Sequence, residues 1–324
     1  MIGNKSDFSC PGLKKGRRGH FFPVAVPASW RKTVLRVYKR SFWVGLILAT
    51  LLQTGLAMTA WAGNPRFYDL ARKAEIDSEQ ALAHLRTRSI VLVGEHHTNA
   101  DHHKGQLAVI RMLHAAGRPI AIGLEMFRAE HQDVLDQWIS GTISPAEFEA
   151  HYYRNWNYPY TLYRPIFEFA RRNRIAMIGL NISAQITGQV ARQGFDSLSA
   201  SQKQALGEVA CRVDQAYMAF IRQAHGAHAH GNLNFTHFCE AQMVWDTVMA
   251  LRSLDYLKAN PGTTVVVLAG AGHAQKMGIP AQIRQRADWP LAVVMPHAPG
   301  SLDPQTLTTA DADYILFNPE SGAD

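Results

Sequence analysis

Two Gly-x-x-His motifs, each at the end of an apolar run rich in β-branched residues, constrain this chain most. The run 90–93 leads into Gly94-Glu95-His96-His97, and the run 265–269 leads into Gly270-Ala271-Gly272-His273. Short continuous apolar runs that end in glycine are typical of buried strands in a mainly parallel sheet. In open sheets of this kind, ligands bind outside the carboxyl ends of the strands. The sequence therefore predicts an α/β fold with both histidines at a ligand-binding edge.

Two further apolar runs extend the same scheme. Residues 120–124 lead into Glu125, and residues 175–180 lead into Asn181. Four strand ends would then bring polar side chains to one rim of the sheet. Solvated loops would explain polar side chains at one or two of these strand ends, but they explain polar side chains at all four strand ends less well. The predicted rim consists of Glu95, His97, Glu125, Asn181 and His273.

The rest of the body alternates helical and extended patterns. Runs at 291–295 and 314–317 predict two more strands, and residues 199–258 are predicted to be helical. Strands that alternate with helices indicate a largely parallel sheet flanked by helices. We therefore predict a single domain over residues 63–324, with a helical cap inserted between the third and fourth strands.

The positive charge of the chain belongs to its N-terminus. The first 40 residues hold ten of the 33 Lys and Arg residues and one of the 26 acids, so 23 basic and 25 acidic residues remain beyond them. Nucleic-acid binding by the body therefore has no support. Residues 41–62 carry no charge and end in Ala60-Trp61-Ala62. Residues 1–62 are predicted to be a basic leader and signal peptide, or an uncleaved membrane anchor, and the body to be exported to the periplasm or beyond.

The body contains two cysteines, Cys211 and Cys239. In an oxidising compartment such a pair favours a disulfide, which would contribute ~3 kcal/mol through loop-closure entropy. Two buried free thiols are the equal alternative.

The residues of the rim allow two kinds of chemistry. His97 and His273 with Glu95 or Glu125 could ligate a divalent metal and leave positions open for a substrate. A Glu–His pair without metal could instead serve as a general base with its orienting partner. Carboxylates at such positions also hold loop amides in place, which is the structural alternative for Glu125 on its own.

An aromatic segment suggests a different ligand. Residues 152–163 contain five tyrosines and lie close to arginines and histidines in sequence. Packing is the usual role of such side chains. A tyrosinate can nevertheless ligate ferric haem, and cationic side chains suit the haem propionates.

An ordered set of motifs resembles the ChaN-type haem-binding uptake proteins. The resemblance runs from about Tyr68 to Tyr314 and therefore covers nearly the whole body. It includes Gly94-Glu95-x-His97, His102-His103-x-x-Gln106, Gly123-Leu124-Glu125-Met126-Phe127, Gln132-x-x-Leu135-Asp136, Leu180-Asn181, Phe238-Cys239-Glu240-Ala241-Gln242, Trp245-Asp246, Met249-Ala250, Gly270-x-Gly272-His273 and Gly278-Ile279-Pro280.

This resemblance implies an exported α/β protein of iron acquisition that binds haem at a homodimer interface. A tyrosine of one subunit would ligate the iron, while a histidine and a lysine of the other would hold the propionates. The candidates for the iron ligand are Tyr68, Tyr153 and Tyr158. For the propionates they are His103 with Lys104, or His273 with Lys276. Family members are often lipoproteins, and this chain has no cysteine at the predicted cleavage point.

The wider clan includes Tiki-type metalloproteases and erythromycin esterases. Tiki-like enzymes use two Gly-x-x-His motifs and a glutamate to bind a divalent metal, a pattern that His97, His273 and Glu125 match. The resemblance therefore implies either a haem-binding protein or a hydrolase on the same scaffold, with Glu95 and His97 as catalytic residues in the second case. Fold kinship does not choose between them, because function depends on the site.

Overall fold

The computed structural model describes residues 65–209, 211–225 and 234–317. The predicted leader and membrane segment, residues 1–62, lie outside the described residues. Among the described helices, none is both long enough and apolar enough to cross a bilayer.

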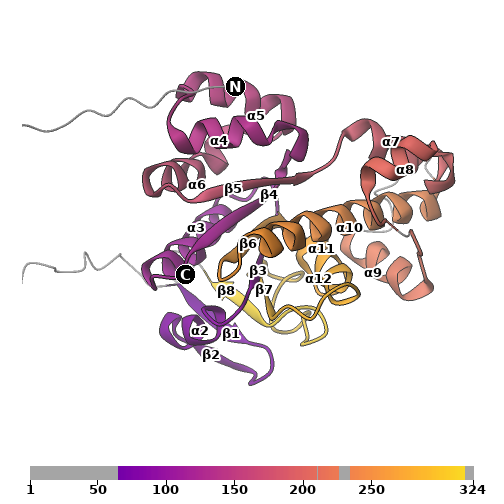
Figure 1. The fold of residues 1–324 in the computed structure, drawn as a ribbon. Helices are drawn as coiled ribbons and strands as arrows, with labels where there is room; N and C mark the ends of the chain where they lie inside the picture. Colours follow the sequence, from indigo (N-terminus) through magenta and orange to yellow (C-terminus); the bar gives the residue numbers. More distant parts are fainter. Residues whose placement is uncertain (1–64, 210, 226–233, 318–324) are drawn as a thin grey trace, which may run out of the picture. The chain divides into compact units, whose positions relative to one another are not determined.

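An eight-stranded sheet forms the centre of the body (Figure 1), in the order β2-β1-β8-β7-β3-β6-β4-β5. The six strands from β8 to β5 pair in parallel, whereas β1 pairs antiparallel with both β2 and β8. The predicted α/β fold with a largely parallel sheet is therefore confirmed. The strands are β1 Arg66–Asp69, β2 Ala74–Ile76, β3 Ile90–Glu95, β4 Ile120–Arg128, β5 Ala176–Asn181, β6 Thr264–Gly270, β7 Leu291–Pro296 and β8 Tyr314–Phe317.

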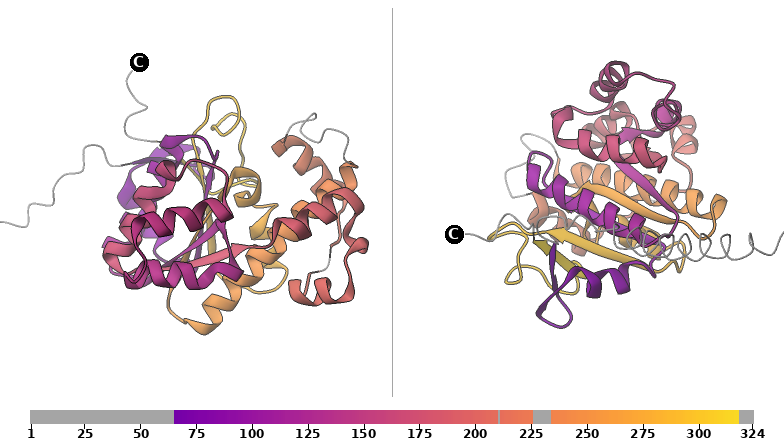
Figure 2. Two further views of the ribbon diagram at one scale, coloured as in Figure 1. Left: turned by 90° about the horizontal axis from the view of Figure 1, so that it is seen from above. Right: turned by 90° about the vertical axis from the view of Figure 1, so that its left-hand side faces the viewer.

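Helices cover both faces of the sheet, as the two views in Figure 2 show. Side chains of α2 to α6 pack in one core cluster, and those of α10 and α12 pack in a second. The helices are α2 Ser78–Leu85, α3 Ala100–Ala115, α4 Gln132–Ser140, α5 Pro145–Asn155, α6 Tyr160–Asn173, α7 Ala184–Gln193, α8 Ala200–Leu206, α9 Gln215–His225, α10 Phe235–Ala259, α11 Ala271–Ala274 and α12 Ile279–Arg284, with 3-10 turns η1 Ala129–His131 and η2 Phe195–Ser197.

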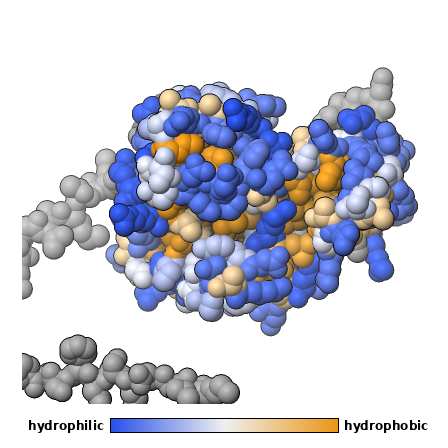
Figure 3. All heavy atoms as spheres, turned by 45° about the horizontal axis from the view of Figure 1, so that its top comes forward, coloured by the Kyte–Doolittle hydropathy of each residue, from blue (hydrophilic) through white to orange (hydrophobic). Residues whose placement is uncertain are grey.

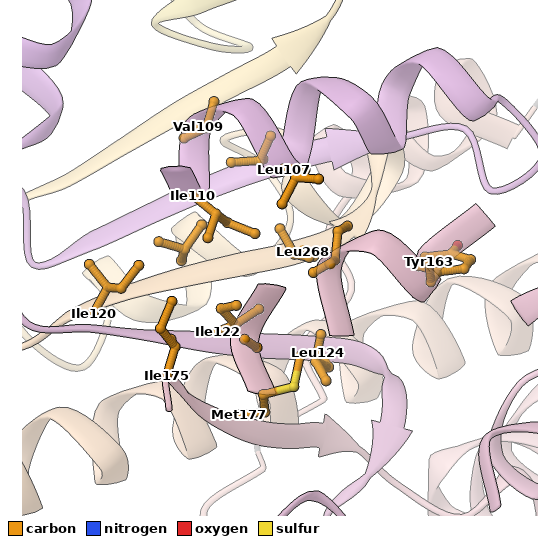
Figure 4. Close-up of a cluster of buried hydrophobic side chains, with 14 of the residues drawn as sticks. Leu107, Val109, Ile110, Ile120, Ile122, Leu124, Tyr163, Ile175, Met177 and Leu268 are labelled. Carbon is orange, nitrogen blue, oxygen red and sulfur yellow. The ribbon is translucent and has the colours of Figure 1, made fainter. Parts of the chain in front are cut away.

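Apolar side chains are largely withdrawn from the surface. The face drawn in Figure 3 is mainly hydrophilic, with apolar residues in separate areas. Alternate residues of each central strand enter opposite clusters, because successive side chains of a strand point to opposite faces. Ile122 and Leu124 of β4, for example, pack with Ile110 of α3 and Leu268 of β6 (Figure 4). Burial of one such side chain contributes about 1.5–3 kcal/mol, so the sheet is fixed between two helical layers.

The predicted insertion between the strands now identified as β5 and β6 is present, with different bounds. Helix formation begins at Ala184, before the predicted 199, and α10 extends to Ala259. The long α10 lies on a face of the sheet, while α9 contacts α11 at the carboxyl end of β6. The insertion therefore covers both a sheet face and one strand end.

Two short strands were not expected from the sequence, and the structure also shows the state of the two cysteines. Strands β1 and β2 were not predicted, because they are short and partly exposed and their residues alternate poorly between apolar and polar. Cys211 and Cys239 are free thiols in the structure. Both pack in a small cluster with Tyr217, where Cys239 is buried and Cys211 is half-buried, so the thiols are free as in the second prediction but only one of them is fully buried.

The topology explains where a ligand site would form. Helix α3, which follows β3, packs in the first cluster, whereas α12, which follows β6, packs in the second. Strands β3 and β6 are neighbours in the sheet. When the helices that follow two neighbouring parallel strands lie on opposite faces of the sheet, a crevice forms at the carboxyl ends of those strands. His97 and His273 follow these two strands.

Candidate functional site

Glu95, the last residue of β3, is the centre of a buried hydrogen-bond network. Its Oε1 accepts hydrogen bonds from His97 Nδ1 at 2.7 Å and from the Tyr163 hydroxyl at 2.5 Å. Its Oε2 lies 3.0 Å from His103 Nδ1, whose N–H is shared with Gln106 Oε1 at 3.1 Å. Burial by itself would raise the pKa of Glu95, but hydrogen bonds from His103 and His97 outweigh this effect and lower the pKa to about 2. Glu95 is therefore a carboxylate at neutral pH.

His97 is held between this carboxylate and an aromatic wall. Its ring lies 4.8 Å from the Tyr158 ring and 5.1 Å from the Trp156 ring, measured between centroids. Burial would lower the pKa of His97, but the hydrogen bond to Glu95 and the charge of Glu125 raise it. The His97 side chain remains 25% exposed. It is therefore an accessible, oriented imidazole.

The second motif forms a matching arrangement. His273 Nδ1 donates to Asp246 Oδ1 at 2.7 Å, and the Tyr217 hydroxyl donates to Asp246 Oδ2 at 2.7 Å. His273 Nε2 lies 3.8 Å from Glu125 Oε1. Burial would lower the pKa of His273, but the charges of Asp246 and Glu125 raise it to about 9. His273 is therefore protonated at neutral pH.

Gly270 brings the two motifs together. Its N–H donates to Glu125 Oε2 at 2.6 Å. A Cβ atom at this position would lie 2.9 Å from His97 Cε1, 3.2 Å from His97 Nε2 and 3.6 Å from Glu125 Oε2. The ring of His97 and the carboxylate of Glu125 therefore both lie against the backbone of Gly270. Glycine is required here because the His97 ring approaches the main chain closely.

Asn181 ties the fourth strand end to the same rim. Its Nδ2 donates to the Glu125 carbonyl at 2.7 Å, and its Oδ1 accepts from Trp245 Nε1 at 2.7 Å. The structure thus brings together all five residues of the predicted rim. Sequence reasoning did not assign Asp246, Tyr217, Trp245 or Tyr163 to the site. Asp246 stood in a motif of the resemblance, and Tyr163 in the aromatic segment, but nothing in their spacing indicated a partner.

The predicted propionate residues lie in different surroundings. His103 is buried, with Nδ1 beside Glu95 and Nε2 3.1 Å from the His97 carbonyl oxygen. Lys104 is exposed on α3 and lies 3.0 Å from Asp101. Lys276 donates to Asp313 at 2.7 Å and to the Thr309 carbonyl at 2.8 Å. Of the three, Lys104 is the one at the surface.

The three predicted tyrosines also differ. Tyr68 is half-buried on β1, and two strands, β8 and β7, separate β1 from β3. Tyr153 is 48% exposed, and its hydroxyl accepts the Tyr160 N–H at 3.1 Å. Tyr158 alone of the three packs against His97. Its hydroxyl forms no hydrogen bond with another residue of the described part of the chain.

The predicted metal ligands do not form a preformed metal site. Within residues 65–209, 211–225 and 234–317, no group of three or more His, Cys, Asp or Glu side chains is arranged to hold a metal ion. Glu125 Oε2 accepts a hydrogen bond from the Gly270 amide. The Nδ1 atoms of His97 and His273 are each hydrogen-bonded to a carboxylate. The arrangement suits proton transfer between imidazoles and carboxylates instead.

Several solved structures are similar to this chain, and the first of them shares its fold. The solved structure of ChaN of Campylobacter jejuni, described with cofacial heme binding, has a TM-score of 0.60 at 19% identity, and the match covers 78% of this chain and 96% of that chain. A mutant of the erythromycin esterase EreC in its open conformation matches at 15% identity with a TM-score of 0.44, covering 69% of this chain and 76% of that one. The type III effector HopBA1 matches at 14% identity with a TM-score of 0.42, and the match covers 74% of this chain and 91% of that one.

Sequence comparison is more specific. No curated protein sequence matches the chain significantly. The profile of the family described as "Haem-binding uptake, Tiki superfamily, ChaN" matches residues 81–283, which is more than half of the chain. This span contains β3 to β6 and every residue of the rim. The chain therefore belongs to the ChaN family of haem-binding uptake proteins in the Tiki superfamily.

Proposed function

We propose that this protein binds haem at the rim beside His97, with Tyr158 as the iron ligand. One observation carries the choice of tyrosine: the half-buried Tyr158 ring packs on the partly exposed His97, and its hydroxyl is free of partners among the described residues. The family supports haem as the ligand. Bound haem would supply a ferric iron that accepts a phenolate oxygen.

The neighbouring side chains suit such a ligand. Trp156 lies 5.5 Å from the Tyr158 ring, so the two rings present an aromatic surface to a flat macrocycle. The His97 imidazole, whose pKa is raised, lies 4.8 Å from the Tyr158 ring, so its protonated form would place a positive charge next to the iron ligand. We propose that exposed Lys104, which lies 3.0 Å from Asp101, pairs with a propionate. We further propose that a second copy of the chain covers the haem, and that export depends on residues 41–62.

A hemin titration of the full chain tests this proposal. Unmodified protein should bind hemin saturably and show the charge-transfer band of high-spin ferric iron with a phenolate ligand. Tyr158→Phe removes the ligand atom and keeps the ring, so it should abolish that band and weaken binding at least tenfold. Circular dichroism checks that the variant is folded.

Two matched variants serve as controls. Tyr153→Phe and Tyr68→Phe remove the hydroxyls of the other two candidate tyrosines and should leave the spectrum unchanged. Loss of the band in either of them, with Tyr158→Phe unaffected, would move the iron ligand to that residue. Absence of saturable binding in the unmodified protein would refute haem binding itself.

A second function, a metal-independent hydrolase, is favoured by one specific observation. Two imidazoles are each oriented by a carboxylate through Nδ1, and Glu125 acts on both: it lies 3.8 Å from His273, and its charge raises the pKa of His97. His97, once deprotonated, could take a proton from water, while protonated His273 could give one to a leaving group. Both roles use side chains of the rim and need no metal.

The pH profile distinguishes this function. Hydrolysis of an activated ester should rise as His97 loses its proton and fall as His273 loses its own near pH 9, which gives a bell-shaped profile. His273→Gln should remove the basic limb. Hydrolysis that is absent, or unaffected by both His97→Gln and His273→Gln, excludes this function for the rim.

A further inference from the structure

Tyr217 links the helical insertion to the rim site. It lies on α9, is 3% exposed, and packs with Ile221, Cys239 and Met243. Helix α9 contacts both α10 and α11 (Figure 1), so Tyr217 stands on an element that joins the helical insertion to the end of β6. A tyrosine in an apolar cluster usually places its hydroxyl on a polar partner. Here that partner is a carboxylate of the site.

Asp246 divides its two oxygen atoms between two donors. Oδ2 accepts from the Tyr217 hydroxyl at 2.7 Å, and Oδ1 accepts from His273 Nδ1 at 2.7 Å. The side chain of Asp246 is fully buried. Because no solvent reaches it, the two donors decide how the carboxylate plane is turned. Removal of the phenol hydroxyl would leave Oδ2 buried without this donor, which is costly for a charged group.

The orientation of Asp246 in turn fixes His273. With Nδ1–H committed to Asp246, the opposite nitrogen, Nε2, is directed toward Glu125 Oε1 at 3.8 Å. The charged groups around His273 come from three elements: Asp246 on α10, Glu125 on β4, and His97 after β3. The hydrogen bond to Asp246 is the shortest of the contacts that His273 makes with them.

We propose that Tyr217 is a positioning residue of the rim site, which holds Asp246 and thereby aims His273 at Glu125. The helical insertion between β5 and β6 would then complete the site as well as cover the sheet, since α9 and α10 supply the two outer members of the chain Tyr217–Asp246–His273. This inference rests on the proposed function in one respect, that His273 belongs to the ligand site. It does not depend on whether the ligand is haem or an ester.

The test is nuclear magnetic resonance of the full chain labelled with nitrogen-15 histidine. A short Nδ1–H to carboxylate bond gives a far-downfield proton resonance, which is assigned to His273 by its loss in His273→Gln. In Tyr217→Phe this resonance should move upfield and exchange faster with water, because Asp246 is free to turn. Tyr314→Phe is the matched control: Tyr314 is 6% exposed in the first core cluster, and its substitution should leave the resonance in place.

An unchanged His273 resonance in folded Tyr217→Phe overturns the proposal. Should that variant fail to fold, replacement of Tyr217 alone by difluorotyrosine keeps the ring and makes the hydroxyl a stronger donor. It should alter the hydrogen bond to Asp246 and thereby shift the same resonance. A resonance that stays at its original position overturns the proposal here too.

Hemin binding separates this inference from the function. If haem is the ligand, Tyr217→Phe should bind hemin more weakly than the unmodified protein, because His273 at the rim loses its fixed orientation. Unmodified protein that binds no hemin refutes the proposed function, and the His273 resonance still decides the role of Tyr217.

Discussion

Glu95→Ala should lower the free energy of unfolding by about 3–5 kcal/mol, the usual cost of removing one partner from a buried charged network. The substitution leaves the Tyr163 hydroxyl and His97 Nδ1 without their acceptor, and it leaves His103 Nδ1 with Gln106 Oε1 alone. Tyr163 and His103 are buried, so water cannot replace the carboxylate. Urea denaturation at pH 7, followed by circular dichroism, measures the loss.

The pH dependence gives this prediction a second test. The pKa of Glu95 is depressed to about 2 in the folded protein, against 4.5 for the free side chain. Its stabilising contribution is therefore fully present above pH 4.5 and is lost as the pH falls toward 2. The difference in stability between the two proteins should narrow over that range. Glu79→Ala, which removes an exposed acid of α2, should change stability by less than about 0.5 kcal/mol. A Glu95 variant as stable as this control would contradict the buried network.

Gly270→Ala should disable the site while the fold persists. The added methyl would lie 2.9 Å from His97 Cε1, a distance that forces the ring to move. His97 cannot yield easily, because Glu95, Trp156 and Tyr158 hold it from the other sides. We expect at least a tenfold loss of hemin binding or hydrolysis, whichever the protein performs. Overpacking of this kind costs about 1–3 kcal/mol of stability. Hemin titration and thermal denaturation measure both effects.

The backbone conformation of Gly270 does not by itself exclude alanine. Its φ of −53° and ψ of 147° are accessible to alanine, so the effect of the substitution is steric and not conformational. Gly188→Ala is the matched control on α7, where the nearest atoms to the new methyl belong to the flexible end of Arg192, the closest at 3.1 Å. Equal ligand affinity in Gly270→Ala and Gly188→Ala would show that the contact between His97 and Gly270 is unimportant.

Much of the fold could be read from the chain. Strands β3 and β6 are short apolar runs that end in glycine, and their burial on both faces produces an unbroken hydrophobic pattern. Helix α2 has a local signal in the sequence, because Asp77 caps it and its apolar side chains repeat at helical spacing. Strands β1 and β2 gave no such signal, since neither is long enough to establish a period.

The rim was predictable for a different reason. Glu95, His97, Glu125, Asn181 and His273 all follow apolar runs, and parallel strands carry their carboxyl ends to one edge. The sequence therefore determined which strand-end residues would meet. It left open what each would contact, because a polar residue after a strand can equally face solvent.

The partners of these residues were decided by tertiary structure alone. Tyr163 lies 68 positions from Glu95 in the chain, and Asp246 lies 27 positions from His273. They meet because α6 and α10 pack on opposite faces of the sheet, and helix packing is set by the fit of many side chains at once. Local sequence patterns determined the strands and the edge at which polar groups gather. The packing of distant helices decided which carboxylate orients which imidazole, since no period in the sequence records a contact between elements that are far apart in the chain.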